Sequence, residues 1–225
     1  MKIEYSQFKE LPYLVGFPDN YVESEKYPIL LFLHGAGTRC EDITKLPNNI
    51  FFKLEAAREN FPFIVVAPLC ASNLTWFDYL KTLKELVIHI ASRDFSDEER
   101  FYVMGNSMGG YGTWQLAMSM PEMFAAIVPI CGGGMYWNAG RLVNVPVWAF
   151  HGGKDTVVYT VESERMVDAV NRKGGSAKLT IYPENGHDSW TDTFSNTEVY
   201  AWLLDHKNQN AKAVQDLIAD TKIYG

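Results

Sequence analysis

Three residues whose side chains can act together in nucleophilic chemistry occur in the order serine, acid, histidine: Ser107, Asp155 and His187. A serine hydroxyl is a weak nucleophile unless a neighbouring base accepts its proton and a third group orients that base. The sequence therefore predicts Ser107 as the nucleophile, His187 as the general base and Asp155 as the acid that orients the base. Asp188 and Asp192 are weaker candidates for the acid, because they follow the histidine.

The residues around Ser107 form the pattern G-x-S-x-G, with glycines at 105 and 109. An apolar run at 100–104 precedes the pattern, and a segment with helical potential at 111–120 follows it. A strand that turns this tightly into a helix leaves no room for side chains at the flanking positions. The pattern predicts a serine at the tip of a sharp turn, beside a helix N-terminus that favours an anion. A glycine-rich turn with an unused serine is the alternative.

Asp155 and His187 each lie in a glycine-containing loop that directly follows an apolar run. Considered alone, Asp155 also fits a turn residue or a helix N-cap, and His187 also fits a surface loop. The joint occurrence of three loops after three predicted strands, in the required order, favours the catalytic interpretation. Two further histidines, His34 and His151, lie at the ends of predicted strands and are candidates for pocket residues.

Attack on a carbonyl group creates an oxyanion, which two backbone N–H groups should stabilise. Met108 directly follows the nucleophile and is predicted to supply one of them. The run Leu33-His34-Gly35-Ala36-Gly37 ends an earlier predicted strand, and its glycines allow the backbone to approach a substrate. Ala36 is the predicted second donor and Gly37 the next candidate. A plain glycine turn is the alternative.

Short apolar runs alternate with longer amphipathic segments along the chain. Most of the runs are nearly continuous in Val, Ile, Leu and Phe, which is typical of strands buried on both faces of a parallel sheet. The predicted strands are 11–17, 29–33, 63–67, 100–104, 125–130, 145–150 and 178–182. Apolar residues at helical spacing predict helices at 77–91 and 160–172. The alternation predicts an α/β fold with a mostly parallel central sheet and helices on both faces; a segregated α+β fold is the alternative.

The composition limits the kinds of partner that fit. Hydrophobic residues make up 47% of the 225 residues, which is too many for a disordered chain. The net charge of −7 argues against nucleic acid and against an anionic membrane surface as partners. Three cysteines without metal-ligand spacing predict no metal site and no disulfide framework. No run approaches a membrane span and the N-terminus has no apolar signal region, so the predicted location is cytoplasmic.

No linker divides the chain, so residues 1–206 are predicted to form one domain. Residues 207–225 are mostly polar and form a predicted C-terminal helical extension, with weakly amphipathic spacing of Ala211, Val214, Leu217 and Ile218. Three roles for this extension stay open: docking on its own domain, contact with a second subunit in a homodimer, and fraying.

Four motifs together resemble the α/β-hydrolase superfamily: HGAG at 34–37, GNSMGGYGTW at 105–114, HGGKDTVV at 151–158 and GHDSW at 186–190. More narrowly, they resemble small single-domain serine esterases related to dienelactone hydrolases and to the catalytic domains of prolyl oligopeptidases. The resemblance covers about residues 12–205 and implies the same roles for the three catalytic candidates, without a metal or organic cofactor. The chain departs from it at Ser107, where dienelactone hydrolases carry cysteine, and at Asn106, where many relatives have an apolar residue.

Many α/β-hydrolases insert a helical lid after the strand that follows the nucleophile, but here only residues 131–144 separate two predicted strands. The predicted site is therefore open and has no lid domain. Candidate walls of the substrate pocket, each with core packing as the alternative, are Trp76, Met135, Tyr136, Trp137 and Trp190.

The predicted function is serine carboxylic-ester hydrolysis through an acyl-enzyme. The partner is a small-molecule ester, with an aromatic acyl group or a sugar as options. A peptidase and an acyltransferase would use the same triad. A non-catalytic binding protein on a hydrolase scaffold is the rival from another class.

Overall fold

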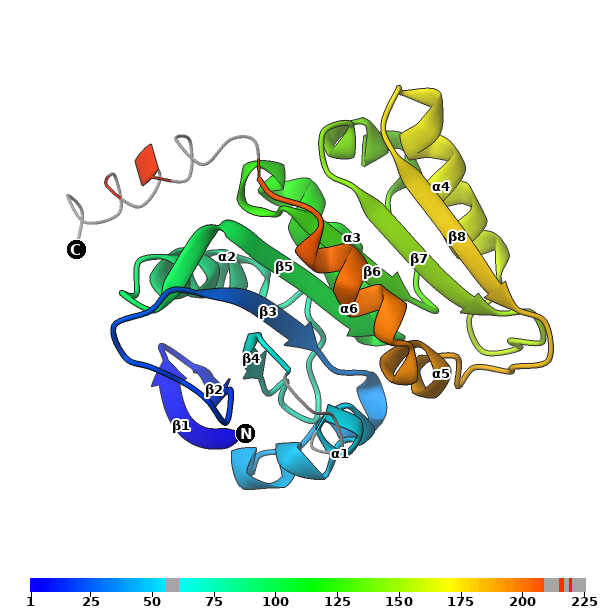
Figure 1. Ribbon diagram of the computed structural model, residues 1–225. Helices are drawn as coiled ribbons and strands as arrows, with labels where there is room; N and C mark the ends of the chain where they lie inside the picture. Colours follow the sequence, from blue (N-terminus) through cyan, green and yellow to red (C-terminus); the bar gives the residue numbers. More distant parts are fainter. Residues whose placement is uncertain (56–60, 209–214, 217–218, 220–225) are drawn as a thin grey trace.

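A single eight-stranded sheet runs through the protein in the order β1-β2-β4-β3-β5-β6-β7-β8 (Figure 1). This computed structural model describes residues 1–55, 61–208, 215–216 and 219. β1 pairs antiparallel with β2 and β2 antiparallel with β4, while the pairs from β4 to β8 are parallel. The predicted α/β fold with a mostly parallel sheet is therefore confirmed. The strands are β1 Lys2–Phe8, β2 Leu11–Phe17, β3 Tyr27–Leu33, β4 Ile64–Pro68, β5 Ser96–Asn106, β6 Ala126–Ile130, β7 Val147–Gly152 and β8 Ala177–Tyr182.

Helices cover both faces of the sheet, and each face has its own hydrophobic core. One core contains the apolar sides of α2, α3 and α4, and the other contains those of α1, α5 and α6. The α-helices are α1 Ile50–Glu55, α2 Leu80–Ala91, α3 Met108–Ser119, α4 Val161–Arg172, α5 Trp190–Ser195 and α6 Thr197–Leu204. Short 3-10 helices are η1 Ala36–Thr38, η2 Ile43–Asn48, η3 Pro121–Met123 and η4 Tyr136–Leu142.

The central strand β3 shows why the apolar runs of the sequence lack alternation. Its side chains at Ile29, Leu31 and Leu33 enter one core, and those at Leu30 and Phe32 enter the other. Both faces of the strand are therefore buried, so every position favours an apolar residue. The carboxyl ends of the parallel strands meet at one edge of the sheet, where the loops that carry the chemistry begin.

β1 was not among the predicted strands, because it lies at the edge of the sheet and most of its side chains are exposed. Its sequence therefore has no apolar run to mark it. The helix predicted over 77–91 begins three residues later, at Leu80. The short helices α1, α5 and α6 were also outside the predicted set, because each is too short for a clear helical period.

The connection between β6 and β7 contains only η4 and short loops. Among the described residues, no helix is both long and apolar enough to cross a membrane. The C-terminal helical extension predicted for 207–225 lies mostly outside the described residues, including all four of its predicted apolar positions.

Candidate active site

Ser107 lies at the sharp turn between β5 and α3. Its backbone has φ 54° and ψ −118°, a left-handed conformation that costs energy for any residue with a side chain. The Ser107 amide donates a hydrogen bond of 2.9 Å to the carbonyl of Ile130 at the end of β6, which ties the turn to the neighbouring strand. This strained backbone conformation directs the Ser107 hydroxyl away from the carboxyl end of β5.

The two glycines of the G-x-S-x-G pattern make this turn possible. A Cβ atom at Gly109 would lie 1.8 Å from the carbonyl oxygen of Leu33, and one at Gly105 would lie 2.4 Å from the carbonyl oxygen of Gly109. Real Cβ atoms do not approach other atoms this closely. The first turn of α3 therefore packs directly on the backbone of β3 and β5, as the pattern predicted.

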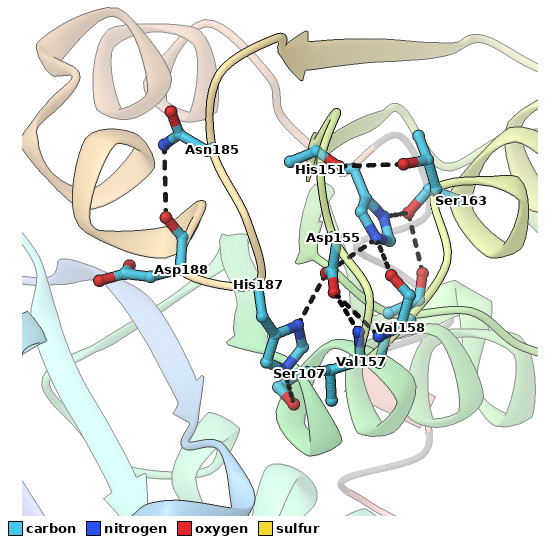
Figure 2. A network of polar contacts seen from close by, with 12 residues as sticks. Ser107, His151, Asp155, Val157, Val158, Ser163, Asn185, His187 and Asp188 are labelled. Carbon is cyan, nitrogen blue, oxygen red and sulfur yellow. Dashed lines mark hydrogen bonds and ion pairs between the residues drawn. The ribbon is translucent and has the colours of Figure 1, made fainter.

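The structure brings Ser107, Asp155 and His187 together in one line of hydrogen bonds (Figure 2). Ser107 Oγ lies 2.8 Å from His187 Nε2, and His187 Nδ1 lies 2.7 Å from Asp155 Oδ2. The three residues follow the carboxyl ends of β5, β7 and β8. These strands are far apart in the sequence, but they are parallel, so their carboxyl ends lie on the same side of the sheet. Asp188 and Asp192, the weaker candidates for the acid, bond to Thr191 and Asn185.

The carboxylate of Asp155 is buried and surrounded by donors. Its Oδ1 accepts hydrogen bonds of 2.9 Å from the backbone amides of both Val157 and Val158. Burial acts to raise the pKa of Asp155, but the bonds from His187 and from these two amides outweigh it, so the pKa lies below its ordinary value. Asp155 is therefore ionised at neutral pH.

The loop that carries Asp155 and the loop that carries His187 pack against each other through glycine. A Cβ atom at Gly152 would lie 2.0 Å from the carbonyl oxygen of Gly186. The Lys154 amide also donates a hydrogen bond of 2.8 Å to the carbonyl of Asn185. This close backbone contact fixes the separation of the acid and the base.

The loop after β3 lies beside the nucleophile and is held by His34. This buried imidazole has Nδ1 2.8 Å from the carbonyl oxygen of Gly35, and its Nε2 accepts a hydrogen bond of 3.0 Å from the amide of Cys70. A Cβ atom at Gly35 would lie 2.9 Å from the side-chain nitrogen of Asn106 and 3.5 Å from Cβ of Ser107. The glycine therefore lets this loop approach the elbow.

The three predicted oxyanion donors lie around Ser107. Ala36 and Gly37 form the start of η1, ahead of its first hydrogen bond, which Thr38 donates to Gly35. Met108 is the first residue of α3, and its N–H has no acceptor within its own helix. Ala36 and Gly37 line the cavity beside Ser107, whereas Met108 is partly buried against the core behind it.

A cavity of about 480 Å³ opens beside Ser107 and His187. Its other lining residues are Gly35, Ala36, Gly37, Thr38, Asn49, Ile50, Asn106, Val157 and Trp190. Trp190 stands edge-on to the imidazole of His187, with 5.2 Å between ring centroids and 90° between the ring planes. Of the five predicted pocket residues, only Trp190 lines this cavity.

The other four predicted pocket residues lie elsewhere. Trp76 is buried in the core, where its indole packs over Gly112 and its Nε1 donates to the carbonyl of His34. Met135 is partly buried against the same core. Tyr136 and Trp137 pack edge-to-face on η4 and are 50% and 70% exposed, outside the cavity lining. The connection after β6 packs η4 against α4 and α3.

Several lining residues were not found from the sequence. Val157 follows Asp155 by two positions, and this spacing is the signal that could have marked it. Its side chain is 68% exposed. Ile50 and Asn49 lie at the start of the unpredicted helix α1, so their positions had no sequence signal. Asn106, noted only as a departure from related elbows, is buried and lines the cavity.

One trio of potential metal ligands occurs among the described residues, and it overlaps the triad. A ligand atom from each of Cys131, Asp155 and His187 lies within 4.8 Å of the other two. Burial raises the pKa of the Cys131 thiol to about 12, so it is protonated at neutral pH and a poor metal ligand. Asp155 and His187 are hydrogen-bonded to each other, which occupies the atoms that would bind a metal ion. The donor set therefore does not fit a resident metal ion.

Comparison with known proteins places this geometry in a family. Residues 73–222 match the model of the dienelactone hydrolase family, a span that covers more than half of the chain and all three members of the triad. The chain belongs to the dienelactone hydrolase family. It is thus a member of a hydrolase family, and the predicted resemblance is confirmed.

Individual relatives of this family member are distant. A Yersinia pestis protein that carries the provisional name carboxymethylenebutenolidase is 24% identical over 205 residues, which cover 81% of this chain and 75% of its own. A thermostable esterase of known structure is 30% identical with a TM-score of 0.78 over 91% of this chain, which spans only 63% of that esterase. A ferulic acid esterase of known structure is 17% identical, and the match covers 90% of this chain and 97% of that esterase with a TM-score of 0.69. At this low identity the likeness shows a shared fold and nothing more.

Proposed function

We propose that this protein hydrolyses carboxylic esters through an acyl-enzyme, with Ser107 as the nucleophile, His187 as the general base and Asp155 as the orienting acid. The observation that carries the proposal is the unbroken line of two short hydrogen bonds from Ser107 Oγ through His187 to Asp155. The family match and the esterases among the relatives support ester hydrolysis as the reaction.

The ionised carboxylate of Asp155 determines which ring nitrogen of His187 carries a proton. Because the carboxylate is ionised, Nδ1 of His187 must carry the proton that joins them. The lone pair of Nε2 then faces the Ser107 hydroxyl, which donates to it over 2.8 Å. His187 is therefore held in the tautomer that can accept the proton when Ser107 attacks.

The reaction then proceeds in two halves. Ser107 Oγ attacks the ester carbonyl while its proton moves to Nε2 of His187, and the backbone amides of Ala36 and Met108 stabilise the oxyanion. The imidazolium, stabilised by Asp155, gives the proton to the leaving alcohol as the bond between the carbonyl carbon and that alcohol breaks. A water molecule, deprotonated by the same imidazole, then cleaves the acyl-enzyme and restores Ser107.

The cavity supports a small ester as substrate. Its volume of about 480 Å³ lies within the range of pockets that hold small ligands. Ile50, Val157 and Trp190 offer apolar surface, and Thr38 and Asn106 offer polar groups. The ferulic acid esterase structure and a bifunctional acetylxylan esterase/xylanase of Neocallimastix patriciarum among the relatives fit an aromatic or acetyl group on a sugar.

The first test is hydrolysis of p-nitrophenyl acetate and p-nitrophenyl butyrate by the parent protein and by Ser107→Ala. The substitution removes the nucleophile and should lower kcat/KM by at least about 10⁴-fold, because the remaining groups only bind and polarise the ester. The fold should be unchanged, since His187 is the one hydrogen-bond partner of the hydroxyl among the described residues. The matched control Ser195→Ala changes a serine on α5 that bonds only within its own helix and should leave kcat/KM unchanged.

Near-parental activity in Ser107→Ala would contradict the proposal. Parental turnover of peptidyl p-nitroanilides, faster than that of the esters, would favour a peptidase on the same triad. Transfer of the acyl group to an added sugar in preference to water would favour an acyltransferase. Each of these rivals predicts the same loss in Ser107→Ala, so the choice of substrate distinguishes them.

A further inference from the structure

His151 is a buried titratable group that the proposed reaction does not use. It is the penultimate residue of β7, and its side chain is completely shielded from solvent. In Figure 2 the Asp155 carboxylate lies between two imidazoles, His187 on one side and His151 on the other. His151 Nε2 lies 3.3 Å from Asp155 Oδ2, the same oxygen that accepts the hydrogen bond from His187.

The contacts of His151 Nδ1 are those of a nitrogen that carries a proton. Nδ1 lies 2.7 Å from Ser163 Oγ on α4, and the same hydroxyl donates over 2.9 Å to the carbonyl oxygen of Gly132. A hydroxyl has one proton, and a carbonyl oxygen can only accept. If the Ser163 proton goes to Gly132, then Nδ1 must be the donor in its contact with Ser163.

The contacts of His151 Nε2 identify a second proton. This nitrogen lies 2.9 Å from the backbone carbonyl oxygen of Val158, in addition to its contact with Asp155. Both neighbours are acceptors. A bare lone pair on Nε2 would therefore face two oxygen atoms in a buried site, which is unfavourable.

Neither neutral form of the imidazole satisfies these contacts. With the proton on Nδ1 alone, Nε2 faces the oxygens of Val158 and Asp155 without a proton between them. With the proton on Nε2 alone, the Ser163 hydroxyl must turn to Nδ1, and the buried Gly132 carbonyl then faces a lone pair at 2.9 Å. The imidazolium form satisfies every contact, and its charge faces an ionised carboxylate.

We propose that His151 is held as an imidazolium and acts as a positioning residue for Asp155, whose carboxylate it keeps directed at His187. The charge state rests on the contacts above, and its effect on the reaction rests on the proposed function. Three donors then surround the carboxylate: the amides of Val157 and Val158 at Oδ1, and His187 at Oδ2. The His151 imidazolium adds a positive charge 3.3 Å from Oδ2.

Other titratable groups around this cluster come from the neighbouring elements. They are Cys131 after β6, Tyr111 on α3, Glu162 on α4, and His187 and Asp188 after β8. Burial raises the pKa of Cys131 to about 12 and raises that of Tyr111, so both are uncharged at neutral pH. The carboxyl groups of Glu162 and Asp188 favour a positive charge at His151. The Cys131 thiol and the Tyr111 phenol are uncharged and do not replace that positive charge.

The proposal sets the sign of an effect on the pH profile. A fixed cation behind Asp155 opposes the addition of a proton to His187, because like charges repel. Only neutral His187 accepts the proton of Ser107, so the cation extends activity to lower pH. Loss of this cation should move the acid limb of kcat/KM to higher pH by about one unit.

The direct test is nitrogen NMR of the parent protein with ¹⁵N-labelled histidine at pH 7. His151 should show protons on both ring nitrogens. His34 serves as the reference, since its amide donor from Cys70 requires a bare Nε2 and hence a single proton. The signals are assigned with the variants His151→Gln and His34→Gln. A single proton-bearing nitrogen at His151 would overturn the proposal.

The second test measures the pH profile of ester hydrolysis in His151→Gln. The variant should show the shifted acid limb and a fall in kcat of about 10- to 100-fold, because Asp155 loses a fixed neighbour. Ser163→Ala removes the acceptor of Nδ1 and should shift the limb in the same direction by less. The matched control His89→Gln, on α2, should leave the profile unchanged.

An acid limb at the parental pH in His151→Gln would overturn the positioning role. If His151→Gln does not fold, Ser163→Ala and the NMR measurement on the parent decide the outcome. Failure of the proposed function is distinguishable, because the parent would then not hydrolyse the esters, or Ser107→Ala would retain ester hydrolysis, whatever the protonation of His151.

Discussion

At the scale of single residues, the atoms next to each ring nitrogen determine the form of three histidines. His34 has an acceptor on one side and an amide donor on the other, so it is neutral with its proton on Nδ1. His187 faces a carboxylate and a hydroxyl, which gives the tautomer of a general base. His151 faces acceptors on both sides. One residue type is therefore proposed to serve three purposes in and around this site: His34 in the loop after β3, His187 as base and His151 behind Asp155.

His34 should make the stability of the protein depend on pH. Burial lowers its pKa from 6.5 to about 4, so the unfolded chain binds a proton in this range that the folded protein does not. The stability linked to His34 is present above pH 6.5 and is lost as the pH falls towards 4, by about 3 kcal/mol in total. Urea unfolding at pH 7 and pH 5 should show it.

The matched variant for this prediction is His34→Gln, which does not titrate. Between pH 7 and pH 5 the parent should lose about 2 kcal/mol more of its free energy of unfolding than the variant. Equal losses in the two proteins would show that the His34 imidazole is not kept neutral by burial.

At the scale of elements, the packing of α3 on the sheet depends on missing side chains. Gly109→Ala would place a methyl group against the backbone of β3, which cannot move without disrupting the sheet. We expect it to lower the free energy of unfolding by more than about 3 kcal/mol. Gly37→Ala is the control for stability, because a Cβ atom there meets no atom within 4 Å.

Chemical denaturation of the two glycine variants measures this difference. The control should unfold within about 1 kcal/mol of the parent. A Gly109→Ala protein as stable as the parent would mean that the elbow does not pack on β3 as closely as the structure has it.

The same scale shows which elements the sequence could predict. Strands such as β3 have both faces buried, so their continuous apolar runs are unmistakable. β1 lies at the sheet edge with exposed side chains, and its pattern resembles a loop. The triad was predictable because each member follows a predicted strand, at a single edge of the sheet. The pocket was not, because Ile50 and Val157 reach the cavity through tertiary packing alone.

Aromatic residues illustrate this limit most clearly. Trp76 and Trp137 were equal candidates in the sequence, yet one is buried under α3 and the other is 70% exposed on η4. Composition and spacing carry no information about which way a loop turns after its strand. Trp190 was placed correctly beside the cavity because it follows His187 by three residues on the same short segment.

At the scale of the whole molecule, one mostly parallel sheet brings loops from distant parts of the chain together at the carboxyl ends of its parallel strands. The loops after β3, β5, β7 and β8 supply, in turn, the candidate oxyanion donors, the proposed nucleophile, the proposed acid and the proposed base. The connection after β6 contains only η4, and the cavity is open to solvent beside Trp190.

The central claim is that Ser107 is an activated nucleophile, and covalent labelling tests it most directly. A fluorophosphonate probe reacts when a serine oxygen attacks phosphorus, fluoride leaves and a base takes the proton. Mass spectrometry of the digested protein should find one label, on the peptide that contains Ser107, and none in Ser107→Ala. A label on another residue, or hydrolysis of esters by a protein that the probe does not label, would contradict the account.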